Sequence, residues 1–418
     1  MTLVDRRVLY ISYNGMLDPL GQSQVIPYLK ELSHAGVRFT LLSFERERAY
    51  TPEGVVQCRE LQRELAEHNI DWHWLRYHKR PSLPATMFDV TQGIRLGRRL
   101  VKQNKIEMVH ARSHIAARIG LALKRRFGLK FIFDVRGLMA DEYVDAGHWQ
   151  KDSVYYSITK ASERKALAAA DGVVTLTEAI WPFIEKSEGL RGRHVVHEVV
   201  PCCADLDLFT FKPQERVRLR KELGVEDRFV IVYSGSIDGW YLTEEMADFF
   251  VVLQQSEPRA HLLWLTTGSH TRIRELMQTR GVATQDYTLH TATTRDVPSY
   301  LSASDAGLAF IKPCFSKLAS SPTKFAEYLA CGLPIVINRG IGDSDSLAEE
   351  HKIAAMVSDF NPDQYAQAAE DLRRLTADPE NTRRRTRSVA EKLFDVRGLG
   401  LDRYVTLYEK VFGEGVAA

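Results

Sequence analysis

Lys324 and Glu327 stand out because their types and spacing suit the binding of a charged ligand. They lie in the segment SSPTKFAEYLACGLPIVIN, residues 320–338. Ser321 is a favourable helix N-cap, and Pro322 would then take the first helical position, where its missing N–H costs nothing. The free N–H groups at the helix start, the helix dipole and the Lys324 ammonium together predict an anion site.

Glu327 follows Thr323 by four residues, so the two share one face of the predicted helix, about 6 Å apart along its axis. An anion at the helix start and a carboxylate one turn further fit a nucleoside diphosphate whose ribose hydroxyls bind Glu327. The alternative is an ordinary capped helix whose glutamate faces solvent.

The neighbouring residues would position this helix against a buried strand. Phe325, Tyr328 and Leu329 form an apolar stripe at helical spacing. Gly332 suits the position after a helix end, where a left-handed backbone is common. Residues 334–337 form a short apolar run that is typical of a parallel strand buried on both faces.

Strand and helix signals alternate along the rest of the chain, in two series separated by a connector over residues 201–213. Repeated βαβ units predict an α/β protein with two Rossmann-like, doubly wound parallel sheets, whose ligands bind at the carboxyl ends of the strands. The predicted strands cover residues 8–12, 38–44, 71–75, 106–110, 130–134, 172–176 and 194–201, then 229–234, 261–266, 287–289, 306–310, 334–337 and 354–357.

The length of 418 residues also favours two domains. We expect them to cover residues 1–205 and 206–395, with a C-terminal helix over 396–418 that packs back toward the first domain. Residues 1–200 carry 30 Lys and Arg against 23 Asp and Glu, whereas residues 201–418 carry 26 against 31. The first domain is thus expected to face something anionic, but the excess is too mild for nucleic acid.

The five cysteines are odd in number and form no CxxC pair. Neither a disulfide framework nor a metal site is indicated, so we expect a metal-free protein of the reducing cytoplasm. No apolar stretch approaches the roughly 18 residues of a membrane span, and the first residues do not resemble a signal peptide.

The loop over residues 14–24 follows the first strand and contains Gly21 and Gln22, just before a helix predicted over 22–33. Gly21 would let the backbone approach a phosphate or a sugar. The alternative is a plain loop whose Gln22 or Ser23 caps the helix. Because no GxGxxG is present, a dinucleotide-binding oxidoreductase is not supported.

Charged residues also follow two later strands of the first half. In HARSHIAA, Arg112 and His114 stand where a strand gives way to a helix. A lone histidine is more often a structural hydrogen bonder than a catalyst, so both roles stay open for His114. In FDVRGLMADEY, Arg136 would pair either with a diphosphate or with Asp134.

Several of these segments together resemble the family 4 glycosyltransferases, the "glycosyl transferase group 1" type with GT-B architecture. The resemblance rests on YSGSIDGWYLTEEM, VPSYLSASDAGLAF, SPTKFAEYLACGLPIV, FDVRGLMADE and the connector PCCADLDLF. It implies that a sugar moves from a nucleotide donor in the second domain to an acceptor hydroxyl in the first, with retention and without a metal or other cofactor.

Glu327 matches the second glutamate of the family's Glu-x7-Glu motif, which holds the ribose, whereas Ala319 stands in place of the first. The family's glycine-loop Arg and Lys also have no match, because Ser236 and Trp240 stand near those places. The cations left for the developing diphosphate charge are Lys324, Lys317 and Arg136. The expected donor-binding residues are Ser236, Ser320, Ser321, Thr323, Lys324 and Glu327, and those on the acceptor side are Gly21, Gln22, Arg112 and His114.

Two other classes compete with the transferase. A nucleotide-sugar epimerase of the same architecture would need acid–base groups near the sugar, for which Glu142 or His114 could serve. A non-catalytic sugar-nucleotide-binding protein would account for Ala319 and the missing glycine-loop charges.

The expected acceptor is a saccharide or a lipid-linked saccharide, in polysaccharide or glycoconjugate synthesis. A helix over residues 91–103 would turn Leu96, Leu100 and their neighbours inward and leave four cations outside, Arg95, Arg98, Arg99 and Lys102. The alternatives are a solvated helix face and a basic face that holds the enzyme at the inner, anionic leaflet of a membrane. Since no exposed apolar residues are expected beside it, attachment would be electrostatic and lost in salt.

Overall fold

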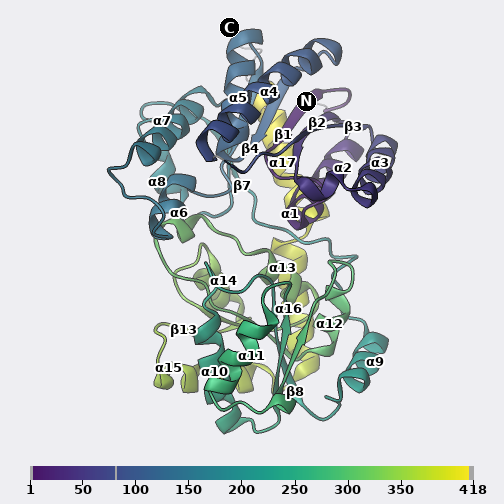
Figure 1. The fold of residues 1–418 in the computed structure, drawn as a ribbon, viewed down its shortest axis with the longest axis vertical. Coiled ribbons are helices and arrows are strands. Elements are labelled where there is room, and N and C mark those ends of the chain that lie inside the picture. Colours follow the sequence, from purple (N-terminus) through teal and green to yellow (C-terminus); the bar gives the residue numbers. More distant parts are fainter. Residues whose placement is uncertain (1–2, 81, 414–418) are drawn as a thin grey trace. The chain divides into compact units, whose positions relative to one another are not determined.

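The chain forms two compact units in the computed structural model, which describes residues 3–80 and 82–413 (Figure 1). The first unit comprises the chain up to Pro201 together with the chain from Val396 onward, and the second runs from Cys202 to Asp395. The chain thus passes between the units at the start of the segment that the sequence predicts as a connector.

Seven parallel strands form the sheet of the first unit, in the order β3-β2-β1-β4-β5-β6-β7. The strand order reverses between β1 and β4, which marks the switch point where such sheets bind ligands. The strands are β1 Arg7–Ser12, β2 Arg38–Glu45, β3 Ile70–Arg76, β4 Met108–Arg112, β5 Lys130–Asp134, β6 Gly172–Thr175 and β7 Val196–Val199.

Helices connect these strands, and the last described helix, α17, packs against α2 and β7 (Figure 1). The helices of this unit are α1 Pro19–Gln24, α2 Ile26–His34, η1 Glu47–Tyr50, α3 Pro52–Glu67, α4 Ser82–Gln103, α5 Ser113–Phe127, α6 Met139–Asp145, α7 Val154–Ala169, α8 Trp181–Glu185, η4 Val396–Gly400 and α17 Leu401–Gly413.

Six parallel strands form the sheet of the second unit, in the order β10-β9-β8-β11-β12-β13. The strands are β8 Phe229–Ser234, β9 Ala260–Leu265, β10 Tyr287–His290, β11 Ala306–Ala309, β12 Ile335–Asn338 and β13 Ala354–Val357. The helices are α9 Pro213–Leu223, α10 Thr243–Ser256, α11 His270–Thr279, η2 Thr284–Asp286, α12 Val297–Ala303, η3 Phe315–Ala319, α13 Thr323–Ala330, α14 Ser344–His351, α15 Pro362–Leu375 and α16 Pro379–Leu393.

Two parallel, doubly wound sheets confirm the predicted fold class, and every predicted strand is present. The prediction for β4 was two residues early. Ile106 donates its N–H to the carbonyl of Val101, and the Glu107 carboxylate accepts the N–H of Arg7, so both residues belong to the turn before the strand. As a result Arg112 ends the strand.

The single helix predicted over 22–33 was wrong. The structure has α1 and α2 instead, which are separated at Val25. Pro27 explains the break, because its ring and its missing N–H do not allow a helix to continue through it from the preceding turn. Helix α3 buries Leu61 and Leu65, whereas Val56 of the same helix is 53% exposed.

No described helix of the chain is long and apolar enough to cross a bilayer.

Candidate functional site

Helix α13 begins at Thr323, and its N-cap residue is Pro322. The predicted N-cap, Ser321, is wrong because its hydroxyl accepts the backbone N–H of Cys202, 3.1 Å away, instead of capping the helix. A proline N-cap has no side-chain acceptor, and the start of α13 has no side-chain cap. The first N–H groups of this helix are therefore suited to an anionic ligand.

The predicted packing of α13 is confirmed. Phe325, Tyr328 and Leu329 are all buried. Gly332 follows the helix with φ of +82° and donates its N–H to Leu329, while Leu333 donates to Tyr328. This pair of bonds is a Schellman motif, which ends the helix and leads directly into β12.

Lys324 lies in the interior, with 4% of its surface exposed. Its Nζ is 3.5 Å from the ring centroid of Tyr241, 4.4 Å from that of Tyr233 and 3.4 Å from the Tyr233 hydroxyl. A Cβ atom on Gly235 would lie only 3.0 Å from the same Nζ. The ammonium therefore lies between two aromatic rings and the glycine loop, residues 234–240, at the end of β8.

Burial lowers the pKa of Lys324 to about 7, against the opposing effect of the Glu327 carboxylate. Burial likewise raises the pKa of Glu327 to about 7, and Lys324 opposes that shift. The Glu327 side chain is half-buried and makes no hydrogen bond to the described part of the chain. Its oxygens can accept hydrogen bonds from a ligand.

The glycine loop after β8 is held by its own backbone and by tyrosines. The Tyr233 hydroxyl donates to the carbonyl of Ser236, and the N–H of Ser234 donates to the Tyr328 hydroxyl at 2.7 Å. Gly235 adopts φ of +140°, which side chains rarely allow. Ser236 is exposed at the loop surface, and its role in donor binding stays a prediction.

Lys317 lies in η3 and is also buried. Its Nζ is 3.8 Å from the ring centroid of Trp240, at the end of the glycine loop. The carbonyl of Lys317 accepts the N–H of Ser320, in the approach to α13. The sequence pointed to the two lysines, but the rings that hold them, those of Tyr233, Tyr241 and Trp240, were not predicted to do so.

In the first unit, several polar groups lie close to Asp134 at the end of β5. Its carboxylate lies 3.8 Å from Arg136 Nε and 3.5 Å from His110 Nε2, and it accepts the Tyr404 hydroxyl at 3.2 Å. Burial alone would raise the pKa of Asp134, but Arg136 and His110 outweigh it and the pKa is lowered. Of the two partners considered for Arg136, Asp134 is thus within ion-pair distance.

Gly21 lies within α1 rather than before a helix start, which corrects the prediction for this loop. A Cβ atom here would lie 2.3 Å from the carbonyl oxygen of Gly15, and Gln22 donates its side-chain amide to the carbonyl of Met16. Both residues therefore pack α1 against the loop after β1. Their contact with an acceptor stays a prediction.

Glu45 binds the loop after β1, a role that was not predicted from the sequence, since the predicted strand ended one residue before it. Its buried carboxylate accepts the N–H of Met16 at 2.7 Å and of Leu17 at 3.4 Å. Burial raises the pKa of Glu45, although these hydrogen bonds and one from Ser43 oppose the shift. An acidic residue directly after an apolar run is the sequence signal that could have indicated the role of Glu45.

His114 is buried and its Nε2 lies 2.8 Å from the Glu163 carboxylate. Lys160 donates to the same carboxylate at 2.6 Å. Burial would raise the pKa of Glu163, but His114 and Lys160 outweigh it and lower the pKa to about 2. These contacts fit the structural role considered for His114, and a role with the acceptor remains a prediction.

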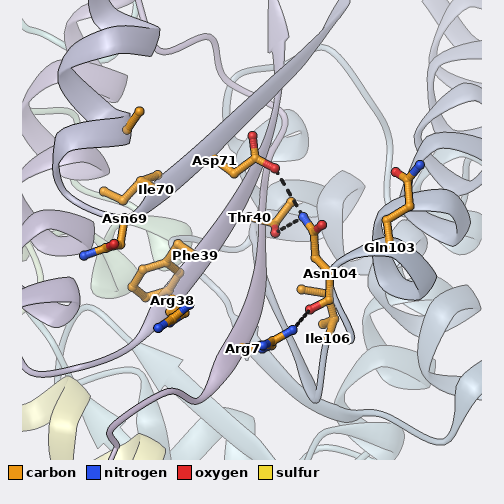
Figure 2. A pocket seen from close by; sticks show the side chains of 11 residues that line it. Arg7, Arg38, Phe39, Thr40, Asn69, Ile70, Asp71, Gln103, Asn104 and Ile106 are labelled. Atoms are coloured by element: carbon orange, nitrogen blue, oxygen red, sulfur yellow. Dashed lines mark hydrogen bonds between the residues drawn. The ribbon is translucent and has the colours of Figure 1, made fainter.

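A cavity of about 390 Å³ lies at the opposite edge of the first sheet, where β1, β2 and β3 begin (Figure 2). Its cations already have partners. Arg7 donates to the carbonyl of Asn104, and Arg38 forms an ion pair with Asp5 at 2.8 Å. Since ligands of such sheets bind at the carboxyl ends of strands, this cavity is not the expected site.

Within the described ranges, no group of three or more His, Cys, Asp or Glu side chains is placed to hold a metal ion.

Two family models match consecutive parts of the sequence. Residues 24–197 match the glycosyl transferase 4-like domain, and residues 228–374 match the glycosyl transferases group 1 model. No curated protein matches the sequence.

Solved structures share the fold over nearly the whole chain. HepE of Anabaena, in complex with UDP and glucose, is 16% identical with a TM-score of 0.68, over 97% of this chain and 100% of its own. Sucrose-phosphate synthase from Thermosynechococcus elongatus is 14% identical with a TM-score of 0.71, over 98% and 100%. WaaG, a glycosyltransferase involved in lipopolysaccharide biosynthesis, is 13% identical with a TM-score of 0.66, over 94% and 98%.

Replacing Lys324 by Met should stabilise the ligand-free protein, most strongly at low pH. The ordinary pKa of 10.5 falls to about 7 on folding, so folding disfavours the protonated side chain. This cost is complete below pH 7 and disappears as the pH rises toward the unfolded value. The difference in Tm between Lys324→Met and the wild type should therefore be largest near pH 6 and shrink toward pH 9.

The exposed Lys221 of α9 offers a matched control. Lys221→Met removes the same charge without relieving burial and should change Tm little at either pH. If Lys324→Met lowered Tm at both pH values, the contacts with the tyrosine rings would outweigh the cost of burial.

Proposed function

Since this chain belongs to the group 1, family 4 glycosyltransferases of the GT-B fold, we propose that it moves a sugar from a nucleoside diphosphate donor bound at α13 to an acceptor hydroxyl. The observation that carries this proposal is the presence of Lys324 and Glu327 one turn apart on α13. A buried ammonium lies under the glycine loop, and a carboxylate with free acceptor capacity lies one helical turn away on the same helix.

The donor is proposed to bind with its diphosphate at the uncapped start of α13 and beside Lys324. Oriented N–H groups and a cation are a preorganised environment for phosphate. The ribose hydroxyls would then donate to Glu327, one turn further along the helix. These hydrogen bonds favour the carboxylate form and so counteract the raised pKa of Glu327.

In the proposed mechanism the bond between the sugar and the diphosphate breaks early. The anomeric carbon becomes oxocarbenium-like while negative charge builds on the diphosphate, where the α13 N–H groups and Lys324 stabilise it. A bound diphosphate also raises the pKa of Lys324 from about 7, so the ammonium form predominates when the donor is present.

Retention follows if the acceptor hydroxyl attacks the face from which the diphosphate departs. The new bond forms between the acceptor oxygen and the anomeric carbon, and a phosphate oxygen takes the hydroxyl proton. This course needs no pair of catalytic carboxylates, in contrast to glycosidases.

Uridine diphosphate sugars are the first donors to test. HepE, with which this chain shares its fold, was solved in complex with UDP and glucose in one structure and with UDP-glucose in another. Ala319 is buried, and it stands where the resemblance implies the first glutamate of the Glu-x7-Glu motif, so the donor would lack a carboxylate at this position.

Glu327→Ala should weaken nucleotide binding about 10- to 150-fold, because a hydrogen bond to a charged group contributes about 1.5–3 kcal/mol. The measurement is calorimetry with UDP, GDP and ADP. Glu327→Gln is the matched control, since it keeps the shape and one acceptor and should lose less affinity. Unchanged affinity in Glu327→Ala would overturn the placement of the nucleotide.

Incubation of the wild type with nucleotide sugars separates the competing functions. A transferase releases free nucleotide slowly when water replaces the acceptor, whereas an epimerase forms a new nucleotide sugar. A protein that only binds nucleotide sugars forms neither product.

Turnover should survive EDTA, because Lys324 and Lys317 can supply the positive charge that a metal provides to the diphosphate in other enzymes. Both lysines lie within 4 Å of an aromatic ring centroid at the glycine loop. The measurement is the rate of transfer before and after chelation. Loss of activity that Mg²⁺ or Mn²⁺ restores would contradict metal independence.

We also propose that the outer face of α4 attaches the enzyme to an anionic membrane leaflet that presents a lipid-linked acceptor. The four predicted cations of this face are exposed. The expectation that no exposed apolar residues accompany them was wrong, because Met87 and Phe88 are 58% and 50% exposed. At 3.6 residues per turn, Phe88, Arg95 and Arg99 point to one side of α4.

Binding to liposomes should therefore rise with anionic lipid content and persist in part at high salt. Each cation near such a surface contributes about 1 kcal/mol, and buried apolar side chains add a salt-resistant component. Sedimentation should show that Arg98→Glu with Arg99→Glu removes the salt-sensitive part and Met87→Ser with Phe88→Ser the remainder. Arg373→Glu with Arg374→Glu, on the exposed face of α15 in the second unit, is the charge-matched control, and an equal loss in this control would contradict attachment through α4.

A further inference from the structure

Arg112 is a buried cation at the carboxyl end of β4, with 6% of its surface exposed. Its Nη1 donates to the side-chain oxygen of Asn14 at 3.4 Å, a long bond to a neutral group. Its Nε is buried and has no hydrogen-bond partner within the described part of the chain. Because arginine stays protonated in proteins, this guanidinium is a permanent charge with an unused donor.

The carboxylate of Asp134, whose pKa Arg112 helps to lower, already has other partners. Asp134 is within 4 Å of both Arg136 and His110, and it also accepts the Tyr404 hydroxyl. Arg112 contributes to lowering the pKa of Asp134, but it ranks behind Arg136 and His110, and among described residues no carboxylate lies within 4.0 Å of its guanidinium. A buried guanidinium without a counter-ion is costly, so the site is electrostatically incomplete.

The surrounding backbone adds to the positive potential. Helix α5 starts at Ser113, directly after Arg112, and its first turn has neither an acidic residue nor a side-chain cap. The positive end of its dipole therefore faces the same edge of the sheet. His110 does not change this balance, because burial lowers its pKa and favours the neutral ring.

We propose that Arg112 binds an oxyanion carried by the acceptor, either a phosphate monoester or a carboxylate. An oxyanion would accept the unused Nε–H and one Nη–H together, which is the bidentate geometry that guanidinium groups favour. The assignment of this oxyanion to the acceptor rests on the proposed transferase function, whereas the anion site itself does not. The acceptor is thus an acidic or phosphorylated saccharide rather than a neutral one.

The alternative role for Arg112 is purely structural, to hold Asn14 in the loop after β1. That role requires only the bond from Nη1 and leaves Nε without a function. It also predicts that a substitution at Arg112 changes stability but not the affinity for small anions.

The test is titration of the full-length protein with methyl phosphate and with acetate, at constant ionic strength, by calorimetry. The wild type should bind one of the two in saturable fashion, and which one binds identifies the source of the oxyanion. Arg112→Met should raise the Kd at least about tenfold, as loss of a charge-assisted hydrogen bond implies. Arg112→Lys keeps the charge without the fork and should show an intermediate loss, which also serves if the Met variant does not fold.

Two controls locate the binding. Arg125→Met removes an exposed cation at the far end of α5 and should leave the Kd within about twofold of wild type. Lys324→Met removes the buried cation that is proposed to bind the donor diphosphate and should leave the saturable site at Arg112 intact. Anion binding that disappears in Lys324→Met but persists in Arg112→Met would overturn the inference, as would the absence of saturable binding of either anion to the wild type. Nucleotide affinity is measured separately, so failure here leaves the assignment of Glu327 untouched.

Discussion

The second unit is organised around a lysine ammonium placed where water cannot solvate it. Lys324 lies between the rings of Tyr241 and Tyr233, and Gly235 leaves the space that its Nζ needs. Burial brings its pKa, and that of Glu327, to about 7. Burial thus disfavours the charged forms of both side chains. A nearby diphosphate would favour the Lys324 ammonium, and hydrogen bonds from ribose hydroxyls would favour the Glu327 carboxylate. The fold thus carries an electrostatic cost that the proposed donor would relieve.

The strands were predictable because each is a short apolar run bounded by polar turns, and burial on both faces leaves no other arrangement for such runs. β5, β8 and β13 have the bounds that the sequence indicated. Errors arose where tertiary contacts decide. The start of α13 shifted because Ser321 bonds to Cys202, which is over a hundred residues away in sequence.

The arrangement of the candidate site was predictable to a similar depth. Lys324 and Glu327 lie one turn apart on one helix, and the sequence displays that spacing directly. The rings around Lys324 come from the end of β8 and the glycine loop, and only the folded sheet brings them to α13. The same holds for Glu45, whose partners Met16 and Leu17 lie on a neighbouring strand's loop. Long-range pairs of this kind leave no periodic signal in one sequence.

The return of α17 to the first unit affects how the protein is made. Tyr404 donates to Asp134, and Tyr408 lies 2.7 Å from His110, so the end of the chain completes the polar interior of the unit formed by its beginning. The ribosome must therefore synthesise the whole second unit before the first can close. The second unit is continuous from Cys202 to Asp395 and can fold as it emerges, whereas the first can close only after α17 has been synthesised. Premature termination within the last helix would cost the first unit its interior while sparing the unit that holds Lys324.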